Sequence, residues 1–415
     1  MRSSIWRRSL KTFSIISLFL VIIVWKKCPC SVKKCELQAT ELRDSRDLHH
    51  LQNERKKALQ ETCKNTSLAL NYVNAMKSMQ ISHKDKILYC GIAKVGCTFF
   101  KRLIYVLNSE KLYKSLFDIT PNNIHGMHTA LVSDLKEPNK SLVEINYKTF
   151  LFVRNPYKRL FSGYVDKIFT PQMYFLLKYG TYIIKKFRKN PSEKSLRCGH
   201  DVTFAEFISY VIDSVKTGNM ANNHFTPMYL HCAPCEIHYD LIGHLETLQN
   251  DLQFLIKPER LKAVLPENLR MSSLRDELFD ATDIAFRNLK SNQNCFSPYE
   301  LLERIWHRLQ IRGILNQKFS FPLTPEEAQT IKQDDFYKML NTYLEKSQMN
   351  PSTVNNRHES INEAFSTVPL DILEKLQSVM EMDCKLFGYD TQPDFVFKAK
   401  NYVNKSFKYF NEINN

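Results

Sequence analysis

Two segments of the chain carry residue types that suit the binding of phosphate groups. In residues 87–107, ILYCGIAKVGCTFFKRLIYVL, an apolar strand pattern is followed by a small-residue turn and an amphipathic helix pattern. Small residues let the backbone approach a ligand, and the N–H groups at a helix start point toward an anion. Lys94 adds a full charge and Thr98 adds a hydroxyl. The spacing is not that of a G-x4-G-K-[ST] loop, which excludes the usual nucleoside-triphosphatase interpretation.

The second segment, residues 150–168, repeats this order of strand, turn and helix with Arg154, Arg159 and Ser162. Arg154 ends the strand pattern, and open α/β sheets bind ligands at the carboxyl ends of their strands. Two anion-binding turns after two strands predict one ligand that carries two phosphate groups.

The elements that must position these residues predict an α/β fold. Strands are expected at 86–90 and 149–153, each followed by a helix, at 96–107 and 155–166. Repetition of this unit predicts a central parallel sheet with flanking helices. Further helices are expected at 203–216, 245–256 and 370–387, the last ended by Gly388. Segment 266–360 is polar and helical in pattern, and we interpret it as a helical insertion.

The N-terminal region has the pattern of a membrane signal anchor. Basic residues flank the apolar run at 12–25, and no A-x-A-like cleavage site follows it, which disfavours a cleaved signal peptide. We expect a cytosolic tail at 1–11, an anchor at 12–25, a helical stem at 26–83, a catalytic body at 84–400 and a tail at 401–415. The stem could pair two copies of the chain as a homodimer.

Several features agree with a lumenal, oxidising compartment. Glycosylation sequons begin at Asn65, Asn139 and Asn404, and all 11 cysteines lie at or beyond Cys28. The odd number of cysteines leaves at least one unpaired or bonded between chains. The formal net charge of +15 favours a polyanionic partner. Because of the anchor and the sequons, nucleic acid is disfavoured as that partner.

Cys232 and Cys235, in CAPC, invite three interpretations. A zinc site would need a second ligand pair at a related spacing, and a redox pair would open a helix after a strand. Neither context is evident, so no metal is expected and a structural disulfide is favoured. Either cysteine could instead bond elsewhere, for instance to Cys198.

Both segments resemble the membrane-bound carbohydrate sulfotransferases of the Golgi, in particular the group that sulfates chondroitin, dermatan and related glycans. The resemblance rests on AKVGCTF at 93–99, FLFVRNPYKRLFSGY at 150–164 and the block at 224–251, with a weaker match at 365–390 that ends in LFGYD. It implies a P-loop-like sulfotransferase fold that binds the donor 3′-phosphoadenylyl sulfate (PAPS). It also implies a type II Golgi membrane protein that sulfates a hydroxyl of an acidic glycan or glycoprotein in the lumen.

The resemblance also implies roles for individual residues. Lys94 would neutralise charge on the bridging oxygen of the donor, and one histidine would act as the base; the candidates are His125, His128 and His224. Residues 93–99 would bind the 5′-phosphosulfate and residues 154–162 the 3′-phosphate. The predicted donor contacts are Ala93, Lys94, Val95, Gly96, Cys97, Thr98, Phe99, Arg154, Asn155, Pro156, Tyr157, Lys158, Arg159, Leu160, Phe161 and Ser162.

Three positions depart from the family pattern. Ala93 replaces a proline, Phe99 an asparagine and Phe225 a tryptophan. These changes motivate an alternative, a lumenal glycan-binding protein on a degenerate transferase scaffold, which donor binding would distinguish from an enzyme.

Overall fold

The computed structural model describes residues 45–66, 75–76, 78–134, 147–219, 222–256, 261, 263–291, 294–403 and 408–410. The expected cytosolic tail and anchor, together with Cys28, Cys30 and Cys35, lie outside these ranges. Within them, no helix combines the length and the apolar character needed to cross a membrane.

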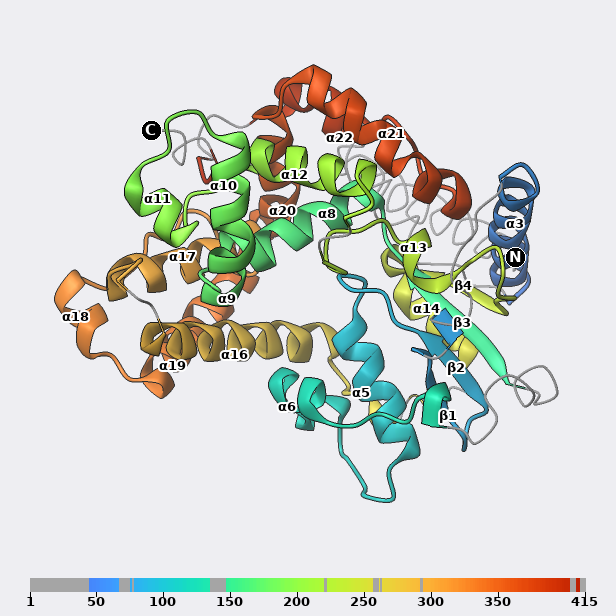
Figure 1. Ribbon diagram of the computed structural model, residues 1–415. Helices are drawn as coiled ribbons and strands as arrows, with labels where there is room; N and C mark the ends of the chain where they lie inside the picture. The colour runs from blue at the N-terminus through green and yellow to red at the C-terminus, as the bar shows by residue number, and fades with distance from the viewer. Residues whose placement is uncertain are drawn as a thin grey trace, which may run out of the picture. The chain divides into compact units, whose positions relative to one another are not determined.

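The centre of the fold is a four-stranded sheet. Its order is β1 (Gln80–Ser82), β2 (Ile87–Cys90), β3 (Lys148–Val153) and β4 (Leu241–His244). β1 pairs with β2 in antiparallel fashion, whereas β2, β3 and β4 are parallel (Figure 1). The predicted strands at 86–90 and 149–153 and the parallel centre are confirmed. The two outer strands, which are only three and four residues long, were not predicted.

Helices follow the central strands as expected. α5 (Cys97–Asn108) follows β2, and α8 (Pro156–Tyr164) follows β3 and continues as one π-helical turn, η3 (Val165–Phe169). The predicted helices at 203–216, 245–256 and 370–387 correspond to α12 (Phe204–Lys216), α14 (Leu248–Leu255) and α21 (Leu370–Phe387). Gly388 ends α21 with φ of 71°, the left-handed geometry that glycine adopts without strain.

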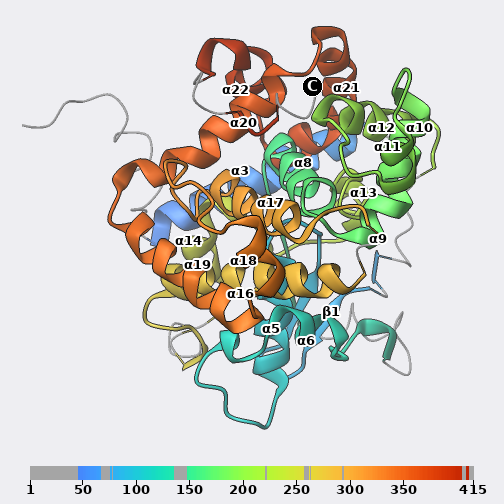
Figure 2. The same ribbon diagram turned by 90° about the vertical axis from the view of Figure 1, so that its left-hand side faces the viewer.

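Segment 266–360 is helical, as predicted. It forms α16 (Leu269–Lys290), α17 (Pro298–Ile311), α18 (Pro325–Thr330) and α19 (Gln333–Gln348), and α20 (Asn356–Ser366) follows. Figure 2 shows α16, α17 and α19 beside one another. Their apolar faces enclose a core around the fully buried Trp306, and Met173, Leu176 and Cys198 from the preceding elements complete this core.

The other described elements are short. They are η1 (Leu116–Asp118), α6 (Pro121–Gly126), η2 (Val132–Asp134), α9 (Met173–Phe175), η4 (Leu176–Gly180), α10 (Thr181–Phe187), α11 (Glu193–Cys198), α13 (Tyr229–Cys232), η5 (Leu245–Thr247), η6 (Pro351–Asn355), α22 (Asp394–Phe397) and η7 (Ala399–Tyr402).

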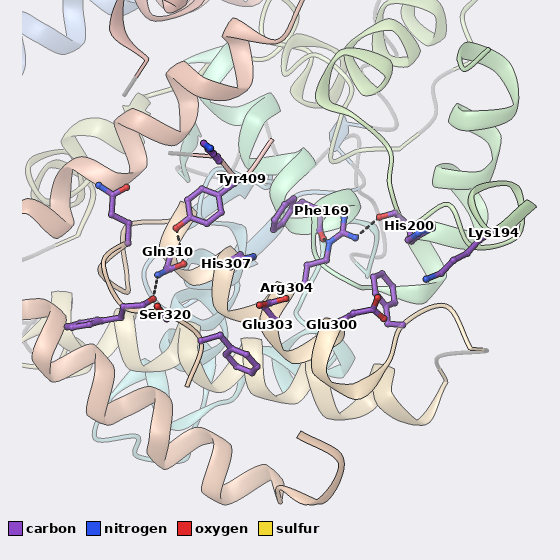
Figure 3. A pocket seen from close by; sticks show the side chains of 15 residues that line it. Phe169, Lys194, His200, Glu300, Glu303, Arg304, His307, Gln310, Ser320 and Tyr409 are labelled. Atoms are coloured by element: carbon purple, nitrogen blue, oxygen red, sulfur yellow. Dashed lines mark hydrogen bonds between the residues drawn. The ribbon is translucent and has the colours of Figure 1, made fainter. Parts of the chain in front are cut away.

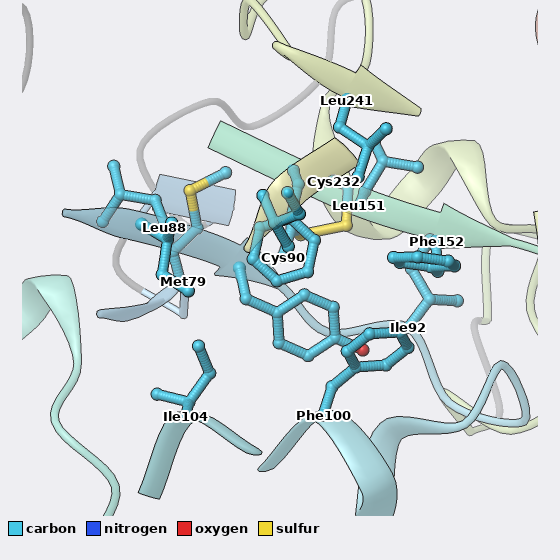
Figure 4. Close-up of a cluster of buried hydrophobic side chains, with 14 of the residues drawn as sticks. Met79, Leu88, Cys90, Ile92, Phe100, Ile104, Leu151, Phe152, Cys232 and Leu241 are labelled. Atoms are coloured by element: carbon cyan, nitrogen blue, oxygen red, sulfur yellow. A yellow bond between two sulfur atoms is a disulfide. The ribbon is translucent and has the colours of Figure 1, made fainter. Parts of the chain in front are cut away.

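Aromatic side chains fix α5 against the sheet (Figure 4). The ring of Phe100 lies 4.9 Å from that of Tyr89 and 4.4 Å from that of Phe152, centroid to centroid. Such contacts add about 0.5–1.5 kcal/mol each to the free energy of burial. Gly243 in β4 keeps this packing possible, because a Cβ there would lie 2.4 Å from the Phe152 ring. The start of α5 is therefore held at the carboxyl end of β2.

The predicted stem needs correction over residues 49–64 and 80–82. Helix α3 (Ser45–Lys64) contacts the sheet from Gln52 onward, and Arg55 donates hydrogen bonds to the Ile242 carbonyl at 2.8 Å and to Asp251 at 2.9 Å. Both side chains of the Arg55–Asp251 pair are buried. A charged helix pattern suggested a solvated stem, but these charges are satisfied inside the folded body.

Among the described residues, three disulfides link distant segments: Cys63–Cys235, Cys90–Cys232 and Cys198–Cys295. The expectation that Cys232 and Cys235 bond to each other is wrong. The two residues lie on either side of a turn in which Ala233 has φ of 40°, and their sulfurs reach β2 and α3 instead. Cys97 and Cys384 form no disulfide with any other described cysteine. Asn65 is exposed just after α3, whereas Asn139 and Asn404 lie outside the described residues.

The disulfide pattern predicts the products of proteolysis under non-reducing conditions. Trypsin leaves Cys232 and Cys235 on one peptide, which should remain joined to the peptides that carry Cys63 and Cys90. Mass spectrometry should detect this three-peptide species and its collapse on reduction. A peptide that carries both residues in a closed ring, free of any partner, would contradict the structure.

Candidate functional site

The turn between β2 and α5 is pinned by two arginines. Arg154 Nη1 donates to the Lys94 carbonyl at 3.2 Å, and Arg159 Nε donates to the Ala93 carbonyl at 2.8 Å. Lys94 itself has φ of 67°, a conformation that non-glycine residues seldom adopt, and Gly96 has φ of 78°. Backbone strain of this kind persists where the surroundings enforce it, and it clusters at functional sites.

Helix α5 begins without a side-chain cap. Its N-cap residue is Gly96, which has no side chain to accept from the first-turn N–H groups, whereas Asn155 caps α8 and Thr203 caps α12. Cys97, Thr98 and Phe99 at this helix start are partly exposed. Their N–H groups and the positive end of the helix dipole can therefore accept an anion.

Lys94 points its ammonium group at Asp166. The Nζ atom lies 2.7 Å from Asp166 Oδ2, and the lysine side chain is 14% exposed. Burial lowers the pKa of Lys94, and the charge of Asp166 partly offsets that effect. The pair holds the ammonium group at the turn, next to the uncapped end of α5.

The Asp166 carboxylate forms ion pairs with three cationic side chains. Besides Lys94, it lies 3.3 Å from Lys167 Nζ and 3.3 Å from Arg308 Nη2 of α17. Burial alone would raise the pKa of Asp166, but the charges of Lys94, Lys167 and Arg308 hold it well below the usual range. Asp166 was not predicted as a site residue. Its position in the π-helical turn η3 is the structural signal, because such turns occur often at functional sites.

Two of the three candidate histidines lie near this centre. His125 Nε2 is 3.1 Å from the Thr98 hydroxyl, and burial together with the charges of Lys101 and Lys167 lowers its pKa to about 4. Burial and the charges of Lys167 and Lys94 lower the pKa of His224 to about 3. Both imidazoles are therefore neutral at pH 7 and able to accept a proton.

The third candidate, His128, lies apart from these groups. Its side chain is 75% exposed and pairs with Asp134 at 3.1 Å. No described contact links it to Lys94, Thr98 or Asp166.

The second predicted segment divides into structural and cavity-lining residues. All three guanidinium nitrogens of Arg159 donate to carbonyls, those of Ala93, Thr226 and Asn223, so this buried side chain positions loops of the protein. The hydroxyl of Tyr157 likewise donates to the Thr391 carbonyl at 2.6 Å. Both side chains thus bind backbone carbonyls of the protein, and their contacts with the donor stay a prediction.

Arg154, Phe161 and Ser162 line a cavity of about 190 Å³. Its other walls come from segments that were not predicted to contribute. They are Val165 of η3, Ser273, Leu274 and Glu277 of α16, Ile311, Arg312 and Ile314 at the end of α17, and Arg357 of α20. Burial, and then the charges of Arg357 and Arg312, lower the pKa of Arg154 well below its usual value. The cavity is thus strongly electropositive.

The departures from the family pattern are accommodated by packing. Phe99 lies edge-to-face with Phe100 at 5.3 Å, and Phe225 is buried edge-to-face with Phe207 at 5.0 Å. Gly163 lets α8 approach this region, since a Cβ there would lie 2.9 Å from the His224 carbonyl oxygen. Ala93 uses only its backbone carbonyl in the contact with Arg159.

A larger cavity of about 620 Å³ lies on another face of α17 (Figure 3). Its walls mix aromatic rings with polar groups, among them Phe169, Glu303, His307 and Tyr409. None of the predicted donor or catalytic residues lines it. Among the described residues, no group of three or more histidine, cysteine, aspartate or glutamate side chains could hold a metal ion.

Comparison with known proteins agrees with these motifs. Residues 77–275 match the model of the sulfotransferase family. The chain is 36% identical over 230 residues to carbohydrate sulfotransferase 11 of Rattus norvegicus, which covers 52% of this chain and 62% of that protein. It is 36% identical over 222 residues to carbohydrate sulfotransferase 9 of Homo sapiens, and this match covers 51% of this chain and 49% of that protein. It is 28% identical over 290 residues to carbohydrate sulfotransferase 12 of Mus musculus, and this match covers 61% of this chain and 67% of that protein.

The chain thus spans about half to two thirds of the length of these curated relatives. No solved structure matches it. The matched region contains β2, the Lys94 turn, β3, α8 and β4, and the relatives are carbohydrate sulfotransferases by name. Over this region the chain is similar to the carbohydrate sulfotransferases.

Proposed function

We propose that the protein transfers a sulfuryl group from PAPS to a hydroxyl of a glycan. The observation that carries this proposal is the pairing of two anion sites at the carboxyl ends of neighbouring parallel strands, one at Lys94 and one at Arg154. Their backbones are in contact through the hydrogen bond from Arg154 to the Lys94 carbonyl. A ligand with phosphate groups at two ends suits two neighbouring anion sites, and PAPS is such a ligand.

The residues of the first site support the chemistry of group transfer. PAPS supplies an activated sulfuryl group on its 5′-phosphate. The open N–H groups of α5 would orient that phosphate, and the Lys94 ammonium would offset negative charge that develops as the group leaves. Asp166 would keep Lys94 in place without neutralising the site, because Lys167 and Arg308 share its charge.

A base must remove the proton of the acceptor hydroxyl. His125 and His224 are neutral at pH 7; His125 is hydrogen-bonded to Thr98, and His224 is close enough to Lys94 for that charge to lower its pKa. Either can accept a proton if the acceptor hydroxyl comes within hydrogen-bond reach. We propose that the base is one of these two residues and not His128.

The proposed setting is the lumen of the Golgi, with the chain anchored as a type II membrane protein through residues 12–25. Three disulfides support an oxidising compartment, and Asn65 is exposed for glycosylation. The net charge of +15 supports an acidic glycan or glycoprotein as the acceptor. The stem upstream of the described residues remains our proposed place of homodimerisation.

Replacing Lys94 tests the transfer site. Lys94→Ala should lower kcat by about 10²–10³-fold, the usual loss when one preorganised charge-stabilising donor is removed. The fold should persist, since Asp166 keeps Lys167 and Arg308 as partners. Transfer of radiolabelled sulfate from PAPS to chondroitin, dermatan, desulfated heparin and glycoprotein acceptors measures the effect. Lys338→Ala, at an exposed position on α19, is the matched control. Full activity of Lys94→Ala would refute the assignment.

The low pKa of the candidate bases predicts the pH dependence of kcat/KM. A base must be unprotonated, so activity is lost as the pH falls through its pKa. With values of about 4 for His125 and about 3 for His224, kcat/KM should stay level from pH 7.5 down to about pH 5.

An ordinary histidine would instead halve kcat/KM near pH 6.5, and that result would contradict the assignment. The same assay on His125→Ala and His224→Ala should identify the base by a large loss of kcat. His238→Ala, at an exposed position, is the control.

A further inference from the structure

The helical segment beyond the family match contributes two arginines to the small cavity. Arg312 follows the last residue of α17, and Arg357 lies in the first turn of α20. Neither residue falls within 77–275, the range that matches the sulfotransferase family. Both face Arg154 and Ser162, which come from the matched range.

Gly313 brings the two arginines to one place. Its φ of 69° turns the chain sharply after α17, and a Cβ on Gly313 would lie 3.3 Å from the Thr353 carbonyl oxygen and 3.5 Å from the Arg357 Cβ. The turn therefore packs directly against the start of α20. This close approach places the 312–314 turn and Arg357 on the same wall of the cavity.

The charges that line the cavity do not cancel. Three guanidinium groups, from Arg154, Arg312 and Arg357, face it together with one carboxylate, that of Glu277. Glu277 pairs with Arg312 at 2.6 Å. Arg357 has no hydrogen bond or ion pair to any other described residue and is exposed to solvent. The lining groups thus carry a net charge of +2.

A phosphate monoester matches this cavity in charge and size. Its second pKa is about 6, so it carries close to two negative charges at pH 7. Guanidinium groups bind phosphate through paired N–H donors, and the Ser162 and Ser273 hydroxyls supply two more. A volume of about 190 Å³ is smaller than the ~300–1,000 Å³ typical of sites for whole small molecules, so the cavity suits one end of a ligand.

We propose that Arg312 and Arg357 complete, with Arg154, a site for a phosphate dianion, and that this site makes the protein select a 3′-phosphorylated nucleotide. The inference rests on the proposed function, because it assigns the ligand of the second anion site. It gives the helical segment at 269–366 a direct part in donor recognition. Donor selection then depends on three chain segments that only the tertiary fold brings together.

Arg357→Ala in the full-length protein is the cleanest test, because Arg357 has no described partner whose loss could unfold the chain. Isothermal titration calorimetry should compare adenosine 3′,5′-bisphosphate with adenosine 5′-monophosphate, which lacks only the 3′-phosphate. The variant should bind the bisphosphate at least tenfold more weakly than wild type does, as expected for loss of a charged hydrogen bond. Its affinity for the monophosphate should change less than twofold.

Arg312→Lys is a second test. It keeps a positive charge beside Glu277 but removes the planar guanidinium group. This variant should also bind the bisphosphate more weakly, with little change in its affinity for the monophosphate. Arg287→Ala, an arginine of α16 that does not line the cavity, is the control. Unchanged affinity for the bisphosphate in Arg357→Ala, or an equal loss for both nucleotides, would overturn the inference. If wild type bound neither nucleotide, the proposed function itself would fail, and the inference with it.

Discussion

The ion cluster around Asp166 is the constraint on which the site depends. One buried carboxylate joins Lys94 of the β2–α5 turn, Lys167 of the same π-helical turn and Arg308 of α17. A buried charge left without any partner typically costs about 3–5 kcal/mol, so Asp166 depends on this set of cations. The cluster ties the Lys94 turn and η3 to the helical segment, which supplies most of a separate hydrophobic core. It also keeps positive charge in excess where an anion must bind.

Elsewhere in the protein, buried arginines also link segments that are distant in the sequence. Arg159 donates to carbonyls of two separate loops, and Arg55 joins α3 to β4 and α14. In each case a long side chain satisfies backbone groups that the fold removes from water, which offsets the cost of burying both. An arginine in a phosphate-binding motif can therefore bind either the ligand or the backbone carbonyls of a loop. Arg154 lines the cavity, whereas each guanidinium nitrogen of Arg159 donates to a carbonyl of the protein.

The sequence predicted the local parts of the fold well, for physical reasons. The apolar runs before Lys94 and at Arg154 gave two central strands, and amphipathic periodicity with clear stop signals gave α5, α12 and α21. Local patterns carry no information on long-range pairing. For that reason the disulfide partners of Cys232 and Cys235, the buried contacts of α3 and the short strands β1 and β4 were missed.

In the candidate site too, residues in local motifs were predicted, whereas residues brought in by long-range packing were not. Lys94, Thr98, His125, Arg154 and Ser162 were predicted from motifs in the sequence. The structure places His125 beside Thr98, and Arg154 beside Lys94 and Ser162. Asp166 follows the second motif directly, but nothing in its sequence context marks it as a partner of Lys94. Arg312 and Arg357 lie in a polar helical stretch whose charges resemble an ordinary solvated surface. Only the turn at Gly313 and the packing of α20 reveal that they face Arg154.

A crystal structure with adenosine 3′,5′-bisphosphate would test the two-ended donor site most directly. The account predicts electron density for the 5′-phosphate at the start of α5, within reach of Lys94, and for the 3′-phosphate among Arg154, Ser162, Arg312 and Arg357. A nucleotide bound with its two ends exchanged, or bound in the cavity lined by His307 and Tyr409, would contradict it.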